Sequence, residues 1–157
     1  MTRPAQNLEP VIEIAERRRD EALAECARLQ TEQRQAQEQM DQLVTYADEA
    51  NRRWAERGAA GVDVTLLMHH RQFMAKLDNA MAFQQDVLAD RAQRVQRATA
   101  AMQEAERDLA SLRKYAARQI EAWQQTLQRR EQKHTDEMAQ NTHRRRLEND
   151  SNFQPMS

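Results

Sequence analysis

The sequence has 157 residues, of which 31% are charged and only 4% are aromatic, and its 24 basic and 25 acidic side chains leave a formal net charge of −1. This composition excludes a large globular core, and the balanced charge excludes a whole-protein field that would hold nucleic acid or an anionic membrane. The dominant residues are strong helix formers, which favours long helices or a coiled coil over the alternative, a disordered chain.

Residues 1–6 are expected to be a flexible N-terminus, and a first helix is predicted over about 7–57, with Asn7 as its cap. Alternating steps of four and three residues from Leu8 lead to fourteen positions. Twelve of them are apolar, and the exceptions are Arg19 and Gln33. The apolar positions of this first seam are Leu8, Ile12, Ala15, Ala22, Cys26, Leu29, Ala36, Met40, Leu43, Ala47, Ala50 and Trp54. Such a repeat is typical of a coiled coil and decides against disorder.

A turn is predicted over 58–63, because the only two glycines of the chain, Gly58 and Gly61, lie there. A second helix is predicted over about 64–140, and twelve of the sixteen positions of its seam are apolar. The apolar ones are Met74, Leu77, Met81, Leu88, Val95, Ala98, Met102, Ala105, Leu109, Leu112, Ala116 and Trp123, and the polar ones are Gln84, Arg91, Gln119 and Thr126. Residues 141–157 are expected to form a disordered C-terminal tail, because Asn141 and Thr142 weaken the helix.

Two seams joined by a short turn predict an all-α fold, a long antiparallel two-helix coiled-coil hairpin with a longer second helix. Residue i is then expected opposite roughly residue 120 − i, which places Leu8 near Leu112. Beyond Leu112 the apolar stripe of the second helix continues without a partner from the first, through Ala116, Ile120, Trp123 and Leu127. An exposed apolar stripe usually marks a binding site, so a contact with another protein is predicted there.

A second strip lies beside the turn. Gln39, Leu43, Tyr46 and Ala50 on the first helix face Phe73, Leu77, Ala80 and Gln84 on the second in the expected register. Two interpretations remain open. Tyr46 and Phe73 either widen the hydrophobic contact near the turn, or they belong to a docking surface, since a narrow hairpin cannot bury both sides of such a strip.

The sequence offers no group of residues typical of catalysis. His69 and His70 are neighbours that point about 100° apart on a helix, so they cannot readily share a metal, and solvated histidines are expected. Cys26 has no histidine in the first helix to activate it and is expected to pack as a small apolar residue. We therefore expect a protein that is not an enzyme, with no cofactor and no metal.

The chain has no apolar run long enough for a bilayer span and no basic, then apolar leader, so direct membrane insertion is not expected. A single cysteine agrees with a reducing compartment, and a cytoplasmic location is expected. Nucleic-acid binding through Arg144, Arg145 and Arg146 is disfavoured because charge is balanced elsewhere.

These features together resemble the FliJ family, the coiled-coil component of the bacterial flagellar type III export apparatus. The resemblance rests on the size, the unequal hairpin, the strip around Tyr46 and Phe73, and the segment from Glu131 to Ala139, EQKHTDEMA, which is similar to the charged ending of the family. Where the family more typically has an aromatic residue and a histidine, this chain has Ala50 and Gln84.

The resemblance implies a non-enzymatic stalk that links the hexameric export ATPase to the cytoplasmic domain of the export gate protein and assists export chaperones. It implies a cytoplasmic protein that associates peripherally with the inner membrane through the export apparatus. The implied gate contact consists of Gln39, Leu43, Tyr46, Phe73, Leu77 and Ala80, and the ATPase contact of Ile120, Trp123, Leu127, Arg130 and Lys133. Two alternatives are an equivalent stalk of a needle-type secretion system and a self-associating coiled-coil chaperone or scaffold.

Overall fold

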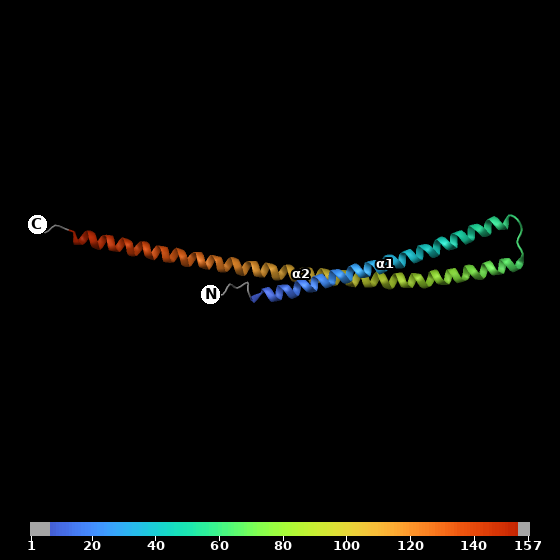
Figure 1. Ribbon diagram of the computed structural model, residues 1–157, viewed down its shortest axis with the longest axis horizontal. Helices are drawn as coiled ribbons and strands as arrows, with labels where there is room; N and C mark the ends of the chain where they lie inside the picture. The colour runs from blue at the N-terminus through green and yellow to red at the C-terminus, as the bar shows by residue number, and fades with distance from the viewer. Residues whose placement is uncertain (1–6, 154–157) are drawn as a thin grey trace. The chain divides into compact units, whose positions relative to one another are not determined.

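The computed structural model describes residues 7–153, which form two α-helices joined by a turn (Figure 1). Helix α1 spans Glu9–Gly58 and has 50 residues, and helix α2 spans Val64–Asn152 and has 89 residues. No strand occurs among the residues that the structure describes. The prediction of an all-α hairpin with a longer second helix is confirmed.

The N-terminal end of α1 combines an acidic residue with a proline. Glu9 lies in the first turn of α1, where a negative charge is favourable, and Pro10 follows at a position where its missing N–H removes no helical bond. The amide of Ile12 donates to the carbonyl of Leu8 at 2.9 Å, so the first helical bond closes there. The expected flexible segment 1–6 lies outside the described residues.

The turn between the helices depends on one glycine more than on the other. Gly61 has a φ of 88°, a left-handed conformation that costs a non-glycine residue about 1–2 kcal/mol. Gly58 is the last residue of α1, and the amide of Ala60 donates to the carbonyl of Arg57 at 3.0 Å. On the far side, the amide of Leu67 donates to the carbonyl of Asp63 at 3.1 Å and begins α2.

The C-terminal end of α2 lies further along the chain than the expected end near Gln140. The helix continues to Asn152, because Asn141 and Thr142 lower helix propensity only slightly and strong helix formers follow them. The hydroxyl of Thr142 donates to the carbonyl of Met138 at 2.8 Å, so it is satisfied within the helix. Of the expected disordered tail, residues 154–157 lie outside the described part of the chain.

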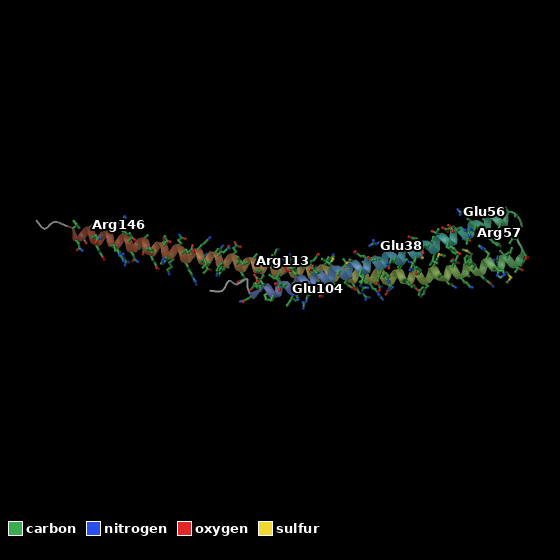
Figure 2. All side chains as sticks on the ribbon, in the orientation of Figure 1. Glu38, Glu56, Arg57, Glu104, Arg113 and Arg146 are labelled. Atoms are coloured by element: carbon green, nitrogen blue, oxygen red, sulfur yellow. The ribbon has the colours of Figure 1, made fainter. Side chains whose placement is uncertain are left out.

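The described chain divides into two units, and Ala15–Asp108 contains the turn and most of both seams. In this unit the two helices run antiparallel from the turn (Figure 1). Every seam position of α1 within the unit is buried or half-buried, and so is every seam position of α2 from Met74 to Ala105. Charged side chains such as Glu38 and Glu104 lie on the surface (Figure 2).

The core of this unit is thin and rich in small residues. Cys26, Leu29 and Ala98 form its buried cluster, against which Val95 and Met102 pack. The Cys26 sulfur lies 3.6 Å from the Thr99 hydroxyl oxygen, and that hydroxyl donates to the carbonyl of Val95 at 2.8 Å. Because its hydrogen is committed to Val95, the hydroxyl accepts and the thiol of Cys26 donates. Cys26 thus packs as the small core residue that was expected.

The observed pairs refine the expected register. Tyr46 contacts Phe73, one residue from the expected partner Met74. Cys26 contacts Thr99, whereas the expected register pairs it with Arg94. The two helices therefore stay close to the expected register at the turn and depart from it by a few residues further along.

The other unit combines Met1–Ile14 with Leu109–Ser157. Leu109 is the most buried residue of its seam, at 2% exposure, and Ala116 is also buried, at 8%. Ile12 and Leu112 are half-buried, as their seam positions predict. From Gln128 to Phe153 every described residue is exposed.

Candidate docking surface

The strip beside the turn presents two aromatic rings to solvent. Tyr46 is 56% exposed and Phe73 is 39% exposed, and their ring centroids lie 5.8 Å apart at an interplanar angle of 65°. This edge-to-face contact joins α1 to α2, so both rings are held in place before any partner arrives. A preorganised, exposed aromatic pair is a typical anchor of a protein interface.

The other four predicted strip residues differ in their exposure. Gln39 is exposed, Leu43 and Ala80 are half-buried, and Leu77 is buried at 8% exposure. Leu77 therefore lies in the core of the hairpin and supports the surface from within. The part of the predicted strip that a partner can reach consists of Gln39, Tyr46, Phe73 and the edges of Leu43 and Ala80.

Gln84 proves to be a core residue of the hairpin. It is 8% exposed, and its side-chain amide donates to the carbonyl of Ala36 at 2.8 Å and to the side-chain oxygen of Gln39 at 3.3 Å. A buried amide requires such partners, because an unsatisfied one costs about 1–3 kcal/mol. Gln84 thus holds the exposed Gln39 in one orientation.

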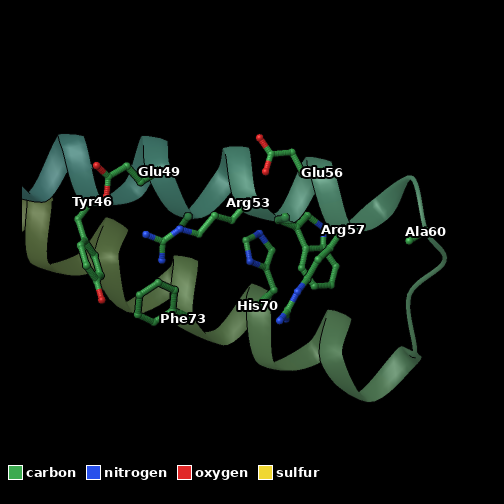
Figure 3. A pocket seen from close by; sticks show the side chains of 10 residues that line it. Tyr46, Glu49, Arg53, Glu56, Arg57, Ala60, His70 and Phe73 are labelled. Atoms are coloured by element: carbon green, nitrogen blue, oxygen red, sulfur yellow. The ribbon is translucent and has the colours of Figure 1, made fainter.

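A groove of about 600 Å³ lies between the helices next to the strip (Figure 3). Its lining residues are Tyr46, Glu49, Ala50, Arg53, Trp54, Glu56, Arg57, Ala60, His70 and Phe73. The guanidinium groups of Arg53 and Arg57 reach toward α2, whereas Glu49 and Glu56 keep their carboxylates on the α1 side (Figure 3). The groove is therefore lined by four aromatic rings, with two guanidinium groups that reach toward α2 and two carboxylates on the α1 side.

Two residues that line this groove, Trp54 and His70, form a stacked pair. The rings of Trp54 and His70 lie 4.3 Å apart, centroid to centroid, at an interplanar angle of 5°. Both residues are half-buried, so the expectation of solvated histidines is wrong for His70, although His69 is exposed. The periodic pattern gave a signal for this contact, because His70 lies four residues before Met74 and so continues the second seam toward the turn.

Two apolar residues near the strip were missed in the sequence. Phe83 is 70% exposed, and Val87 is half-buried. The signal was a second apolar repeat on α2, in which Phe73, Ala80 and Val87 are seven residues apart. Phe83 lies between the last two of these at a spacing of three and four.

Ion pairs on the outer faces link neighbouring turns and, in one case, both helices. Arg28 bonds to Glu25 and to Glu32, and Arg91 on α2 lies 3.9 Å from the carboxylate of Glu32. The hydrogen bond from Arg28 lowers the pKa of Glu25 and raises the pKa of Arg28. These groups are solvent-exposed, so their pairing contributes little to stability.

The second predicted contact region lies in the unit that contains Leu109–Ser157. Ile120, Trp123 and Leu127 are half-buried, and Arg130 and Lys133 are exposed. The indole nitrogen of Trp123 is buried and has no hydrogen-bond partner among the described residues. A buried indole N–H without an acceptor is uncommon in native structures, where Trp usually finds a partner.

Over residues 7–153, no group of histidine, cysteine, aspartate or glutamate side chains is arranged to hold a metal ion. Within the same residues, neither α1 nor α2 has a stretch long and apolar enough to cross a bilayer.

Comparison with known proteins gives one family. The model of the flagellar FliJ protein family matches residues 4–148, nearly the whole chain, and so confirms the resemblance seen in the sequence. No curated protein and no solved structure matches the sequence.

Proposed function

We propose, since this chain belongs to the flagellar FliJ protein family and is thus a component of the flagellar export apparatus, that it acts as a non-enzymatic coupling stalk. In this role it links the hexameric export ATPase to the cytoplasmic domain of the export gate protein. It works in the cytoplasm, associates peripherally with the inner membrane through the export apparatus, and assists export chaperones.

The strip beside the turn is the proposed gate contact. The observation that supports it most strongly is the Tyr46 and Phe73 pair, which is exposed and yet fixed by an edge contact between the two helices. Binding to such a pair costs little side-chain entropy, because the rings are already ordered. Gln39, oriented by Gln84, adds a polar group at the rim.

The proposed ATPase contact comprises Ile120, Trp123, Leu127, Arg130 and Lys133. The half-buried side chains of Ile120, Trp123 and Leu127 support this assignment, because they leave apolar surface that a partner can cover. The apolar stripe around Trp123 continues the seam and supplies the hydrophobic part of an interface. Lys133 adds an exposed cation at its end.

The proposed mechanism is allosteric. A helical hairpin that contacts the subunits of a hexamer unequally favours those nucleotide states that it binds more tightly. By linkage, nucleotide binding then changes the affinity of the ring for the stalk by the same factor. If the nucleotide state that the stalk favours is one that a subunit must reach in order to hydrolyse ATP, binding of the stalk raises the rate of hydrolysis.

Co-purification of the full chain with the ATPase and with the gate's cytoplasmic domain tests the two contacts separately. Phe73→Ala is expected to abolish gate binding and to leave ATPase binding intact, and Trp123→Ala with Leu127→Ala is expected to do the reverse. Val44→Ala is the matched control, because Val44 is 41% exposed and follows Leu43 on the other flank of the seam. If both altered proteins keep both partners, the assignment of the two surfaces is wrong.

The ATPase assay tests the mechanism independently. Saturating amounts of this protein are expected to raise the rate of ATP hydrolysis, and an unchanged rate contradicts the allosteric part of the proposal. A stable dimer in sedimentation, together with no affinity for the ATPase, would instead identify a self-associating scaffold.

A further inference from the structure

Three of the hollows between the helices of Ala15–Asp108 lie on one flank of the hairpin. The first is the groove at the turn, with a volume of about 600 Å³. The second, of about 260 Å³, is lined by Glu32, Gln35, Ala36, Gln39, Val87 and Arg91. The third, of about 360 Å³, is lined by Glu25, Arg28, Leu29, Arg94, Arg97 and Ala98.

The heptad repeat explains why these hollows share a flank. Each contains residues that lie three places after one seam position and one place before the next. These residues are Tyr46, Gln39, Glu32 and Glu25 on α1 and Phe73, Val87 and Arg94 on α2. In an antiparallel pair of helices, such positions of the two helices face each other along the same side. We name this side the groove flank. A hollow on the opposite flank, of about 370 Å³, is lined mainly by Gln, Ala, Met and Leu and contains no aromatic ring.

On α2 the groove flank carries a second heptad seam, formed by Phe73, Lys76, Ala80, Phe83 and Val87. Their spacings of three and four residues match the pattern by which one helix receives another. Phe83 is 70% exposed, so this seam has no helix packed over it. The seam covers about 20 Å along α2, which is the length of a partner helix of four turns.

We propose that the groove flank binds one amphipathic helix of a partner protein, laid along the hairpin with apolar residues on Phe73 and Phe83 and with carboxylates at both ends. The mode is the insertion of a helix into a groove between two helices. Where the partner helix is a segment of the gate protein, this inference rests on the proposed gate contact.

The acidic ends follow from the charges of the groove flank. Arg53 and Arg57 at the turn make no ion pair with any described residue, and neither does Arg97 at the far hollow. Arg28, Arg91 and Arg94, by contrast, are paired with Glu25, Glu32 or Asp90. Glu49 and Glu56 also line the groove at the turn, but their carboxylates stay on the α1 side, whereas the guanidinium groups of Arg53 and Arg57 reach toward α2 (Figure 3). Positive charge is therefore presented between the helices at the turn and by Arg97 at the far hollow, and carboxylates are its complement.

The same charges disfavour a second copy of the chain as the occupant. In an antiparallel pair of copies, the end of one flank with Arg53 and Arg57 would lie against the end of the other with Arg97, and like charges across an interface weaken it. A partner with the opposite charge removes this repulsion.

The test uses a synthetic, side-chain-stapled helical peptide of about 18 residues, with leucines at heptad spacing and glutamates at both ends. Its affinity for the full-length chain is measured by fluorescence anisotropy, beside that of an otherwise identical peptide with lysines at the ends. Phe83→Ala is expected to weaken binding of the glutamate peptide by at least about tenfold, as for an anchor residue. Val44→Ala is expected to change it by less than about twofold. Both residues are exposed, so both variants should keep the helicity of the parent chain in circular dichroism.

Charge reversal provides the second arm. Arg53→Glu with Arg57→Glu is expected to lower affinity for the glutamate peptide and to raise it for the lysine peptide. If the unaltered chain binds both peptides equally, the proposed charge complementarity is wrong. If Phe83→Ala and Val44→Ala lose equal affinity for the glutamate peptide, the groove flank is not its binding site. A dimer that Phe83→Ala dissociates in sedimentation assigns the flank to a second copy and also overturns the proposal.

The gate's cytoplasmic domain separates this inference from the proposed function. If that domain does not bind while the peptides follow the expected pattern, the gate assignment fails and the groove stands. If the domain binds, and its binding is weakened by Phe73→Ala but not by Phe83→Ala, the gate assignment stands and the proposal of a helix-binding groove is wrong.

Discussion

The side-chain amide of Gln84 donates a hydrogen bond to the backbone carbonyl of Ala36 across the hairpin, with a nitrogen to oxygen distance of 2.8 Å. Gln84 occupies a seam position that an apolar residue would fill more favourably, yet it is buried. A single buried polar residue at such a position usually fixes the register at some cost in stability. The same side chain also donates to Gln39 at the rim of the strip. The residue that fixes the register of the core therefore also contacts a residue of the exposed strip.

Gln84→Leu is therefore expected to raise the free energy of unfolding by about 1 kcal/mol, because an apolar side chain replaces a buried amide. The carbonyl of Ala36 keeps its helical hydrogen bond and is not left unsatisfied. Urea unfolding measures the stability. Spin labels at 37 and 85, in a Cys26→Ala background, are expected to show a broader distance distribution as the register loosens. Gln42→Leu, at an exposed position of α1, is the control. A loss of stability in Gln84→Leu would show that the hydrogen bond outweighs its desolvation.

The two glycines of the turn are expected to respond to alanine with opposite signs. Neither added Cβ meets a neighbouring atom within 4 Å, so backbone conformation alone decides. Gly58 ends α1 without a positive φ, and Gly58→Ala should raise the free energy of unfolding by about 0.5–1 kcal/mol. Gly61 has a φ of 88°, and Gly61→Ala should lower it by about 1 kcal/mol. Thermal unfolding of the two variants measures both signs, and a change of the same sign in both contradicts the role assigned to Gly61.

Leu29 and Leu23 give a matched pair on α1. Leu29 is 7% exposed and belongs to the buried cluster with Cys26 and Ala98, whereas Leu23 is 39% exposed. Leu29→Ala is expected to lower the free energy of unfolding by about 2–3 kcal/mol, since it removes buried methyl groups and leaves a cavity. Leu23→Ala should cost less than about 1 kcal/mol. Similar losses in both variants would mean that the cluster around Cys26 is not the core of this unit.

Acid titration of Glu25 tests its pairing with Arg28. The hydrogen bond from Arg28 lowers the pKa of the Glu25 carboxyl below its usual value. A depressed pKa means that the pair contributes stability above the usual value, and that this contribution is lost as the pH falls through the lowered one. Arg28→Gln should return the pKa of Glu25 to its usual range, as followed by the carboxyl carbon shift in NMR. Arg34→Gln, elsewhere on α1, should leave it unchanged.

Much of the fold could be predicted because a coiled coil is encoded by spacing. The alternation of four and three residues identified both seams, and all fourteen positions of the first seam are buried or half-buried in the structure. In the second seam only Thr126 is exposed. Its hydroxyl donates back to the carbonyl of Ala122 at 2.9 Å, so the exposed side chain is satisfied within its own helix.

The surface was harder to predict than the seams. Side-chain spacing placed Tyr46 opposite Phe73, but it assigned Leu77 both to the seam and to the strip. In the structure Leu77 is buried, whereas Phe73 is 39% exposed. The spacing also placed Gln84 on the strip, although the side chain is buried and donates to two acceptors on α1. The end of α2 was missed since helix propensity changes little after Gln140.

The distribution of the two tryptophans has a practical consequence. Trp54 lies in the unit Ala15–Asp108, stacked on His70 at the turn, and Trp123 lies in the other unit with its indole nitrogen buried. The emission of a tryptophan depends on its immediate surroundings, so each ring is an intrinsic optical probe of its own region. With Trp123→Phe or Trp54→Phe, a single chain without any attached dye can report which of its two proposed binding surfaces a partner has covered, and in what order.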